Sequence, residues 1–298
     1  MAELLSELSA SFQRHLRAEG RAKRTCALHE QAIRFFSDWL NGQGLSAISE
    51  NCTKDNIRNW LADLADQVGP GTVRIRWAGM RRFTRWLVAE GVLDDYPMTG
   101  LGEPEVPEKP VPVLSDDELA ALIKACSGKD FAARRDEAII RMLLDCGLRV
   151  SELCGITVEG LDLDNGSVMV TGKRGKVRQA FFGARTERAL DRYVRMRRQH
   201  RWSHAEALFL GQRGALSTDG VRTRMEVRAA QAGLADPSNP HRFRHTWAND
   251  FLLAGGQERD LKRLAGWSSD VMLEVYGRSA ADARAEKAAR QMKRGDRV

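Results

Sequence analysis

The first third of the chain carries apolar residues at a helical period and contains no convincing strand pattern. From Leu4 to about Val92, apolar positions recur every three or four residues, as on the buried side of amphipathic helices. Thr53 precedes one run as a candidate N-cap, and Pro70 begins another where proline is tolerated. One predicted core stripe consists of Leu28, Ala32, Phe35 and Trp39. The pattern predicts a compact bundle of four helices.

The fourth predicted helix carries a row of basic residues beside its apolar side. Its predicted core side consists of Trp77, Met80, Phe83 and Leu87. Arg74, Arg81 and Arg85 lie almost in line along another side, and that row contains no acid. A solvated charged face is the ordinary explanation of such a row, whereas a row of one sign favours contacts to phosphates. We therefore predict that these three arginines contact a polyanion.

A proline-rich segment separates this bundle from the rest of the chain. Residues 98–113 contain four prolines and follow no helical or strand period, which is typical of an extended connector. Ser115 and Glu118 then form the capping-box pattern that begins a helix. The predicted organisation is an N-terminal helical domain over residues 1–97, a linker over 98–113 and a second domain over 114–298.

The best strand pattern lies in the middle of the second domain. A turn at Asn165–Gly166 precedes an apolar run from Val168 to Thr171. A turn rich in glycine, lysine and arginine then separates it from a second run, Val177 to Phe182. The other segments are helical in pattern, so the predicted fold class is mainly α with a small antiparallel β-sheet.

The amino-acid composition limits which kinds of partner and which cellular compartment we expect for this protein. The 298 residues include 47 Lys+Arg against 40 Asp+Glu, a net charge of +7, which favours a polyanionic partner without identifying it. The five cysteines form no C-x-x-C pair, which predicts buried thiols rather than a zinc site. No signal peptide and no apolar run of membrane length is present, so we expect a cytoplasmic protein without a membrane partner.

The segment from His241 to Tyr276 gathers residues suited to phosphate chemistry. His241, Arg244 and His245 are spaced to share one face of a helix. The segment continues through Leu-Ala-Gly-Trp-Ser-Ser, which contains Trp267, and ends at Tyr276. A tyrosine hydroxyl titrates at about pH 10, so as a nucleophile it needs a proton acceptor and cations that stabilise the product.

Together with two upstream motifs, this segment resembles the active site of the tyrosine recombinases, the phage-integrase family. The upstream motifs are CGLRVSEL, with Arg149, and VTGKRGKVR, with Lys173. The resemblance implies an N-terminal SAM-like core-binding domain and an α+β catalytic domain. It also implies a C-terminal helix that either covers its own domain or docks on a neighbouring subunit. Two departures are Trp267, where many relatives carry His, and VRQAFFG, where V-P-L is common.

The resemblance assigns the covalent steps to two residues. Tyr276 attacks phosphorus to form a 3′-phosphotyrosine link, and Lys173 protonates the departing 5′-oxygen. Because the covalent bond conserves the energy of the phosphodiester, strands are rejoined without ATP. The chain has no glycine-rich phosphate loop and no cluster of acids that resembles a metal site, so we expect no metal or other cofactor.

Four further residues would act on the phosphate. Arg149 and Arg244 hold its oxygens with their planar, permanently charged guanidinium groups, and two fixed cations can replace a metal. Trp267 donates its indole N–H, and His241 either donates a ring N–H or accepts the proton of the phenol. Glu152, three residues after Arg149, either forms an ordinary surface pair with that arginine or holds its guanidinium in position.

The resemblance also predicts how the protein meets its partners. The family places a helix near Thr218 to Ala232 in the major groove, where Arg222 and Arg224 would contact base edges. The expected partner is double-stranded DNA, bound by a homotetramer that is mainly monomeric without DNA. Since the helical bundle starts almost at residue 1, we expect short crossover sites without distant arm-type sites.

Three other functions remain beside a mobile-element integrase. A Xer-like resolvase of chromosome or plasmid dimers would use the same chemistry. A type IB topoisomerase would share the tyrosine but relax supercoils without pairing sites, and the small N-terminal bundle argues against it. A catalytically silent DNA-binding protein would have no reason to keep Arg149, Lys173, His241, Arg244 and Tyr276 together.

Overall fold

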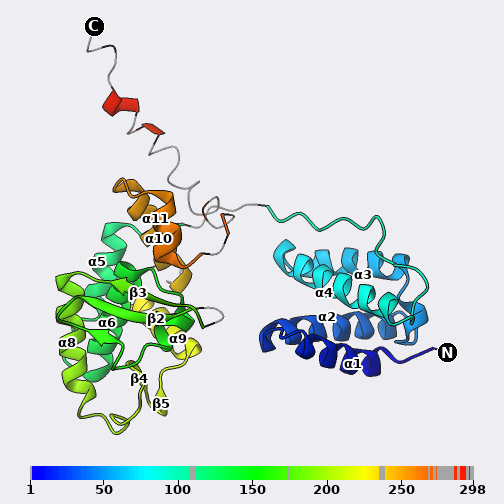
Figure 1. The fold of residues 1–298 in the computed structure, drawn as a ribbon, viewed down its shortest axis with the longest axis horizontal. Helices are drawn as coiled ribbons and strands as arrows, with labels where there is room; N and C mark the ends of the chain where they lie inside the picture. Colours follow the sequence, from blue (N-terminus) through cyan, green and yellow to red (C-terminus); the bar gives the residue numbers. More distant parts are fainter. Residues whose placement is uncertain are drawn as a thin grey trace. The chain divides into compact units, whose positions relative to one another are not determined.

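Four α-helices form the N-terminal unit, Met1–Lys109, of the computed structural model (Figure 1). They are α1 (Leu5–Ala18), α2 (Lys23–Gly42), α3 (Lys54–Gln67) and α4 (Pro70–Ala89), with a 3-10 helix at Ser49–Asn51. Thr53 caps α3 by accepting a hydrogen bond from the backbone N–H of Asn56, and Pro70 begins α4. The predicted bundle is confirmed. The structure describes residues 2–107, 112–172, 175–234 and 239–267, together with 269, 270, 273, 285, 286, 289–292 and 295.

The core face of α2 is offset by one residue from the predicted stripe. Ile33 and Phe36 are buried, whereas Phe35 keeps 36% of its surface exposed. The guanidinium carbons of Arg34 and Arg76 lie 5.3 and 4.6 Å from the centroid of the Phe35 ring, which is a favourable position for cations. The predicted period of this helix is therefore confirmed. Of the predicted stripe, Ala32 is buried, Leu28 and Trp39 are half-buried, and Phe35 is wrong. The predicted core side of α4 is confirmed: Trp77, Met80, Phe83 and Leu87 are all buried.

The second unit, Pro110–Val298, packs helices against one face of a small three-stranded sheet, whose other face is exposed (Figure 1). Its helices are α5 (Asp116–Ala125), α6 (Phe131–Cys146), α7 (Val150–Cys154), α8 (Ala184–Arg197), α9 (Thr218–Gln231), α10 (Pro240–Leu253) and α11 (Glu258–Ala265). Strands β1 (Leu161–Asp162), β2 (Ser167–Thr171) and β3 (Val177–Phe181) form an antiparallel sheet in that order, and β4 (Leu210–Gly211) pairs with β5 (Gly214–Ala215). The predicted fold class is confirmed.

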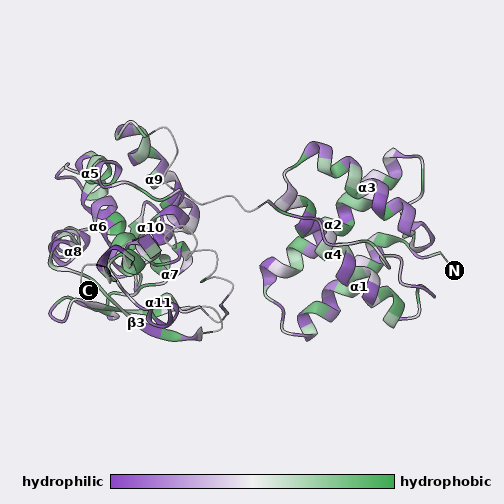
Figure 2. Ribbon diagram, turned by 90° about the horizontal axis from the view of Figure 1, so that it is seen from above, coloured by the Kyte–Doolittle hydropathy of each residue, from purple (hydrophilic) through white to green (hydrophobic). Residues whose placement is uncertain are grey.

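The first unit ends at Lys109 and the second begins at Pro110, and both positions fall inside residues 98–113. Met98 is 3% exposed and packs into the core of the N-terminal bundle. On the other side, the backbone N–H of Leu114 donates to the hydroxyl of Thr246 at 2.8 Å, which fixes the start of the second unit to α10. The capping box of Ser115 and Glu118 at α5 is present as predicted. Figure 2 shows hydrophobic and hydrophilic residues alternating along the helices of both units.

The end of α6 is shaped by Gly147, which adopts a left-handed conformation with φ 55°. A Cβ atom at this glycine would lie 2.1 Å from the ring of Trp247 on α10, so only a glycine allows the two helices to approach this closely. This contact seats α10, which carries the histidine and arginine motif, against the end of α6.

The cysteines and the apolar character of the helices were the subject of two predictions from composition. All five cysteines have free thiols, and four are buried while Cys154 is half-buried. Burial raises the pKa of Cys126 and of Cys154 to about 11, so these thiols are unreactive at neutral pH. Within the described part of the chain, no helix combines the length and apolar character needed to cross a membrane.

Candidate active site and DNA-binding surfaces

A buried carboxylate, Glu152, lies at the centre of the predicted site. It belongs to α7 and is 4% exposed, and Arg149 is the N-cap residue of the same helix. Arg149 donates its backbone N–H to one oxygen of Glu152 at 2.9 Å and its Nη1 to the other at 2.7 Å. Glu152 therefore holds both the backbone and the guanidinium of Arg149, which is the arrangement expected of a supporting residue rather than of a surface pair.

Arg244 on α10 reaches the same carboxylate from a distant part of the chain. Its side chain is 1% exposed, and its Nη1 lies 3.8 Å from an oxygen of Glu152. The guanidinium donates to the backbone oxygens of Gly147 at 2.5 Å and Ala265 at 2.7 Å, which end α6 and α11. Its carbon lies 5.4 Å from the centroid of the Trp267 ring. The fold thus brings Arg149, Glu152, Arg244 and Trp267 together.

The two histidines of the motif differ in exposure and in charge state. His241 is exposed and lies one helical turn before Arg244. Its pKa is lowered, first by partial burial of the ring and then by the positive charges of Arg244, Arg149 and Arg222. His245 is 9% exposed, and burial lowers its pKa to about 4. Both rings therefore favour the neutral form at neutral pH, and His241 is the one that solvent can reach.

Sequence reasoning missed Arg178 on β3. Its Nη2 donates to Glu152 at 3.1 Å and its Nε to the backbone oxygen of Leu264 at 2.8 Å. The alternation of side chains along β3 was the available signal. However, the apolar Val177 and Phe181 suggested that their face of the strand is the buried one. They are 58% and 55% exposed, whereas Arg178 points inward. Three guanidinium groups therefore surround Glu152.

Two predicted catalytic residues, Lys173 and Tyr276, lie outside the described residues, so their roles stay predictions. Gly172, which precedes Lys173, is described at the end of β2. A Cβ atom on Gly172 would lie 3.5 Å from an oxygen of Glu152, so β2 ends beside the carboxylate. No group of His, Cys, Asp or Glu residues within the described ranges is placed to hold a metal ion.

Glu152→Gln is expected to lower the free energy of unfolding of the chain by about 3 kcal/mol, because three guanidinium groups would lose their shared carboxylate. Urea unfolding of the full chain measures this. Glu137→Gln on α6 is the matched comparator, since Glu137 is 6% exposed and pairs with Arg134, Arg141 and Arg192 away from the site. We expect comparable losses. A Glu152→Gln variant as stable as the parent would show that the carboxylate does not hold the site together.

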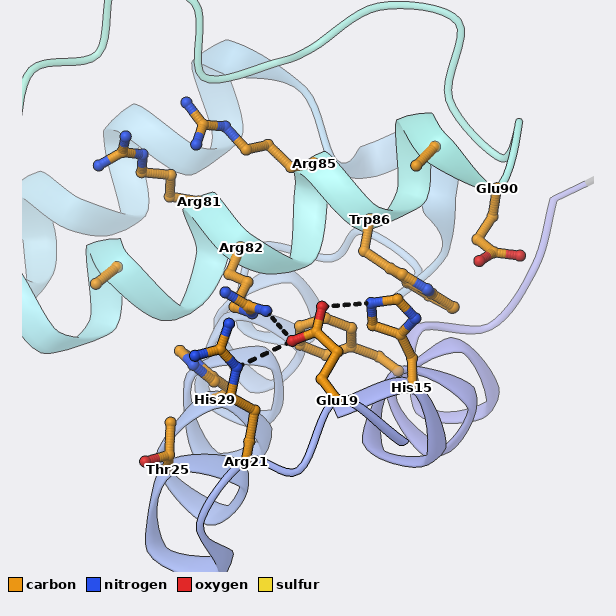
Figure 3. Close-up of a pocket in the computed structure, with 13 residues that line it drawn as sticks. His15, Glu19, Arg21, Thr25, His29, Arg81, Arg82, Arg85, Trp86 and Glu90 are labelled. Carbon is orange, nitrogen blue, oxygen red and sulfur yellow. Dashed lines mark hydrogen bonds and ion pairs between the residues drawn. The ribbon is translucent and has the colours of Figure 1, made fainter. Parts of the chain in front are cut away.

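In the N-terminal unit, Arg81 and Arg85 of the predicted arginine row border an open pocket of about 570 Å³ between α1, α2 and α4 (Figure 3). Arg21 and Arg82 point toward Glu19, which ends α1 and forms ion pairs with both. Arg81 and Arg85 point away from that carboxylate and form no ion pair within the described residues. Their guanidinium groups lie over the rings of Trp77 and Tyr96. Arg81 and Arg85 therefore keep their charge available to a ligand.

Two other predicted DNA contacts are already engaged by carboxylates. Arg74 pairs with Glu103 at 2.7 Å, an acid from outside the helix, so a DNA contact of Arg74 would have to compete with this exposed ion pair. Arg224 donates through Nε and Nη2 to the fully buried Asp136 at 2.9 and 2.8 Å, which favours a structural role over base reading. Arg222 is half-exposed, and its one ion pair among the described residues is with a solvated aspartate of its own helix, Asp219.

Both units of the chain are similar in sequence to known recombination proteins. Residues 10–91 match the phage integrase N-terminal SAM-like domain, and residues 112–283 match the phage integrase family. The tyrosine recombinase XerC of Oceanobacillus iheyensis (strain DSM 14371 / CIP 107618 / JCM 11309 / KCTC 3954 / HTE831) is 31% identical over 274 residues, which cover 89% of each chain.

Solved structures share the fold at low sequence identity. The Tn1549 transposon integrase in complex with transposon right end DNA has a TM-score of 0.74 at 18% identity, covering 96% of this chain and 100% of that chain. A lambda integrase tetramer bound to a Holliday junction has a TM-score of 0.72 at 17% identity, covering 92% and 77%. With the family match over most of the second unit and the identity to XerC, this chain belongs to the phage integrase family, the tyrosine recombinases.

Proposed function

We propose that this tyrosine recombinase cuts and rejoins duplex DNA at specific sites through a 3′-phosphotyrosine intermediate. The observation that carries the proposal is the meeting of Arg149 and Arg244 at Glu152. With Arg178, three guanidinium groups face one carboxylate, which leaves two positive charges among these four residues. Such an excess in a largely buried site favours a phosphodiester.

The arginines would act on the phosphate because attack at phosphorus builds charge on its non-bridging oxygens. Arg149, whose side chain is 34% exposed, offers donors that solvent and DNA can reach. Arg244 is buried, so water screens its charge little. Since Glu152 and two backbone carbonyls already orient both groups, they need little rearrangement as charge develops. Trp267 would add an indole N–H donor.

The covalent step would exchange one phosphoester bond for another. The oxygen of Tyr276 bonds to phosphorus while the bond from phosphorus to the 5′-oxygen breaks. Lys173 gives its proton to that leaving oxygen, and His241 accepts the proton of the phenol. The lowered pKa of His241 supports this role, because a neutral imidazole can accept a proton. Rejoining reverses the step with the 5′-hydroxyl of the partner strand.

DNA would be held by both units. Arg81, Arg85 and Arg222 are the proposed contacts, since their charges are exposed or not buried in ion pairs. Assembly as a homotetramer on DNA is supported by the likeness to the lambda integrase tetramer. The free protein would be mainly monomeric. A double-stranded DNA substrate in turn implies action in the cytoplasm.

Two biological roles fit this chemistry. Integration of a mobile element is the leading proposal, on the resemblance of the active-site motifs to the phage-integrase family. A Xer-like resolvase is the second candidate, favoured by the 31% identity to XerC. Short direct or inverted repeats that flank the gene would favour the first role.

The test uses a duplex with a nick close to the cleavage point, so that the cut strand leaves and the adduct is trapped. We expect a covalent protein–DNA adduct whose DNA is attached to the peptide that contains Tyr276, identified by mass spectrometry. Strand exchange that requires two sites supports a recombinase, whereas relaxation of supercoils without sites would indicate a topoisomerase. DNA binding without any adduct would identify a silent DNA-binding protein and overturn the proposal.

A further inference from the structure

We propose that Arg178 is a positioning residue that aligns the hairpin of Lys173 with the phosphate-binding arginines. The inference rests on the proposed function, because it assigns to Arg178 an effect on protonation of the leaving oxygen. Arg178 lies on β3, and Lys173 belongs to the segment that connects β2 to β3. In the register of this hairpin, Arg178 pairs with Val170 on β2.

The first observation is that Arg178 and Arg149 share an acceptor. The same oxygen of Glu152 accepts from the backbone N–H of Arg149 at 2.9 Å and from Nη2 of Arg178 at 3.1 Å. Gly172 approaches the other oxygen of this carboxylate from the opposite strand. One strand of the hairpin is thus bonded, through Arg178, to the group that also orients Arg149, and the other strand ends beside that group.

The second observation is that Arg178 also holds the end of α11. Its Nε donates to the backbone oxygen of Leu264, and Arg244 donates to the next backbone oxygen, that of Ala265. Gly266 follows in a left-handed conformation, φ 64°, and a Cβ atom there would lie 3.4 Å from Nε of Arg178. Arg178 and Arg244 therefore bind adjacent carbonyls just before Trp267.

Arg178 is mostly buried and does not act as a solvated surface cation. Its side chain is 15% exposed, and its Nη1 is buried without a hydrogen-bond partner in the described part of the chain. A buried donor without a partner costs free energy, which the two hydrogen bonds and the ion pair offset. The arrangement is explained if Arg178 fixes the hairpin, because a proton donor displaced by about 1 Å can lose about 100-fold in rate.

The consequence concerns the leaving group. When Tyr276 attacks, the bond from phosphorus to the 5′-oxygen breaks, and the oxygen needs a proton from Lys173. When a sulfur atom replaces that oxygen, the bond from phosphorus to sulfur breaks and a thiolate leaves without a proton. A residue that acts through Lys173 matters for the oxygen substrate and little for the sulfur substrate.

The experiment measures single-turnover cleavage at saturating DNA with both nicked substrates, for the parent, Arg178→Gln, Arg178→Lys and Lys173→Ala. On the oxygen substrate we expect Arg178→Gln to be about 10- to 100-fold slower than the parent, with unchanged DNA affinity. On the sulfur substrate we expect this deficit, and that of Lys173→Ala, to shrink to within about threefold of the parent. Gln179→Ala, which faces outward and bonds to Ser167, is the matched control and should cleave normally.

Three outcomes would overturn the inference. Equal deficits of Arg178→Gln on both substrates would mean that Arg178 acts on the phosphate itself. A normal rate of Arg178→Lys would show that the two hydrogen bonds do not position the hairpin, and this conservative variant keeps the test usable if Arg178→Gln is poorly folded. Additive effects in the Arg178→Gln, Lys173→Ala double variant would show that the residues act independently. If the parent forms no adduct, or sulfur does not restore Lys173→Ala, the proposed function fails instead.

Discussion

Tyr276→Phe is expected to abolish the covalent adduct with nicked DNA, a loss of at least about 10⁴-fold in the rate of strand cleavage. Phenylalanine keeps the ring but lacks the oxygen that bonds to phosphorus, so no covalent bond between protein and DNA can form. Affinity for DNA should be unchanged, because the phenol contributes a bond and not a charge. Gel separation of the adduct under denaturing conditions, beside a filter-binding measurement of affinity, checks both parts.

The other two tyrosines of the chain are the matched controls. Tyr193 is fully buried, and its hydroxyl donates to the backbone oxygen of Leu208 and accepts from the N–H of Leu210. Burial raises the pKa of Tyr193 to about 12, so its phenolate is not accessible at neutral pH. Tyr96 packs against the core of the N-terminal bundle. Tyr96→Phe and Tyr193→Phe should both form the adduct, and an adduct from Tyr276→Phe would refute the assigned nucleophile.

Arg244→Lys is expected to slow cleavage by about 10²- to 10³-fold at saturating DNA, the usual effect of losing one donor that stabilises developing negative charge. Lysine keeps the positive charge but cannot bond to Gly147 and Ala265 together while facing Glu152. The ammonium group of the lysine would then not be held in a fixed position beside the phosphate. The rate is measured well below the melting temperature, so that unfolding does not contribute.

Arg242→Lys separates this catalytic effect from a loss of packing. Arg242 lies on the same helix, is 7% exposed, and donates to the backbone oxygens of Pro112 and Val113 and to Glu118. Both substitutions should lower the melting temperature, because each removes a buried guanidinium that bridges two segments. Only Arg244→Lys should slow cleavage. Equal effects of the two variants on cleavage would assign Arg244 a structural role only.

Local patterns predicted those parts of the fold that depend on neighbouring residues. The caps at Thr53 and Ser115 and the pairing of β2 with β3 follow from backbone preferences that a short segment sets by itself. The site motifs were also visible, because Arg149 and Glu152 are three residues apart and His241 and Arg244 lie on one helical face.

Long-range pairings could not be predicted in the same way. Phe35 and Phe36 are equally apolar, so only the packing of α2 against α4 decides which one is buried. Arg224 looks like a solvated cation until α6 places Asp136 beside it. Arg178 was missed because its role depends on the carboxylate of Glu152 and the backbone carbonyl of Leu264, which belong to two helices remote in sequence. The sequence of β3 alone does not indicate either contact.

Gly147 has a consequence for directed evolution of this enzyme. Its backbone carbonyl accepts from Arg244, and its missing side chain admits Trp247, so one residue sets the seating of the helix that bears half of the site. In a library that varies this position, most variants would have a distorted active site. Libraries meant to retarget the enzyme to new DNA sequences are better confined to exposed groups such as Arg222, whose replacement leaves that seating intact.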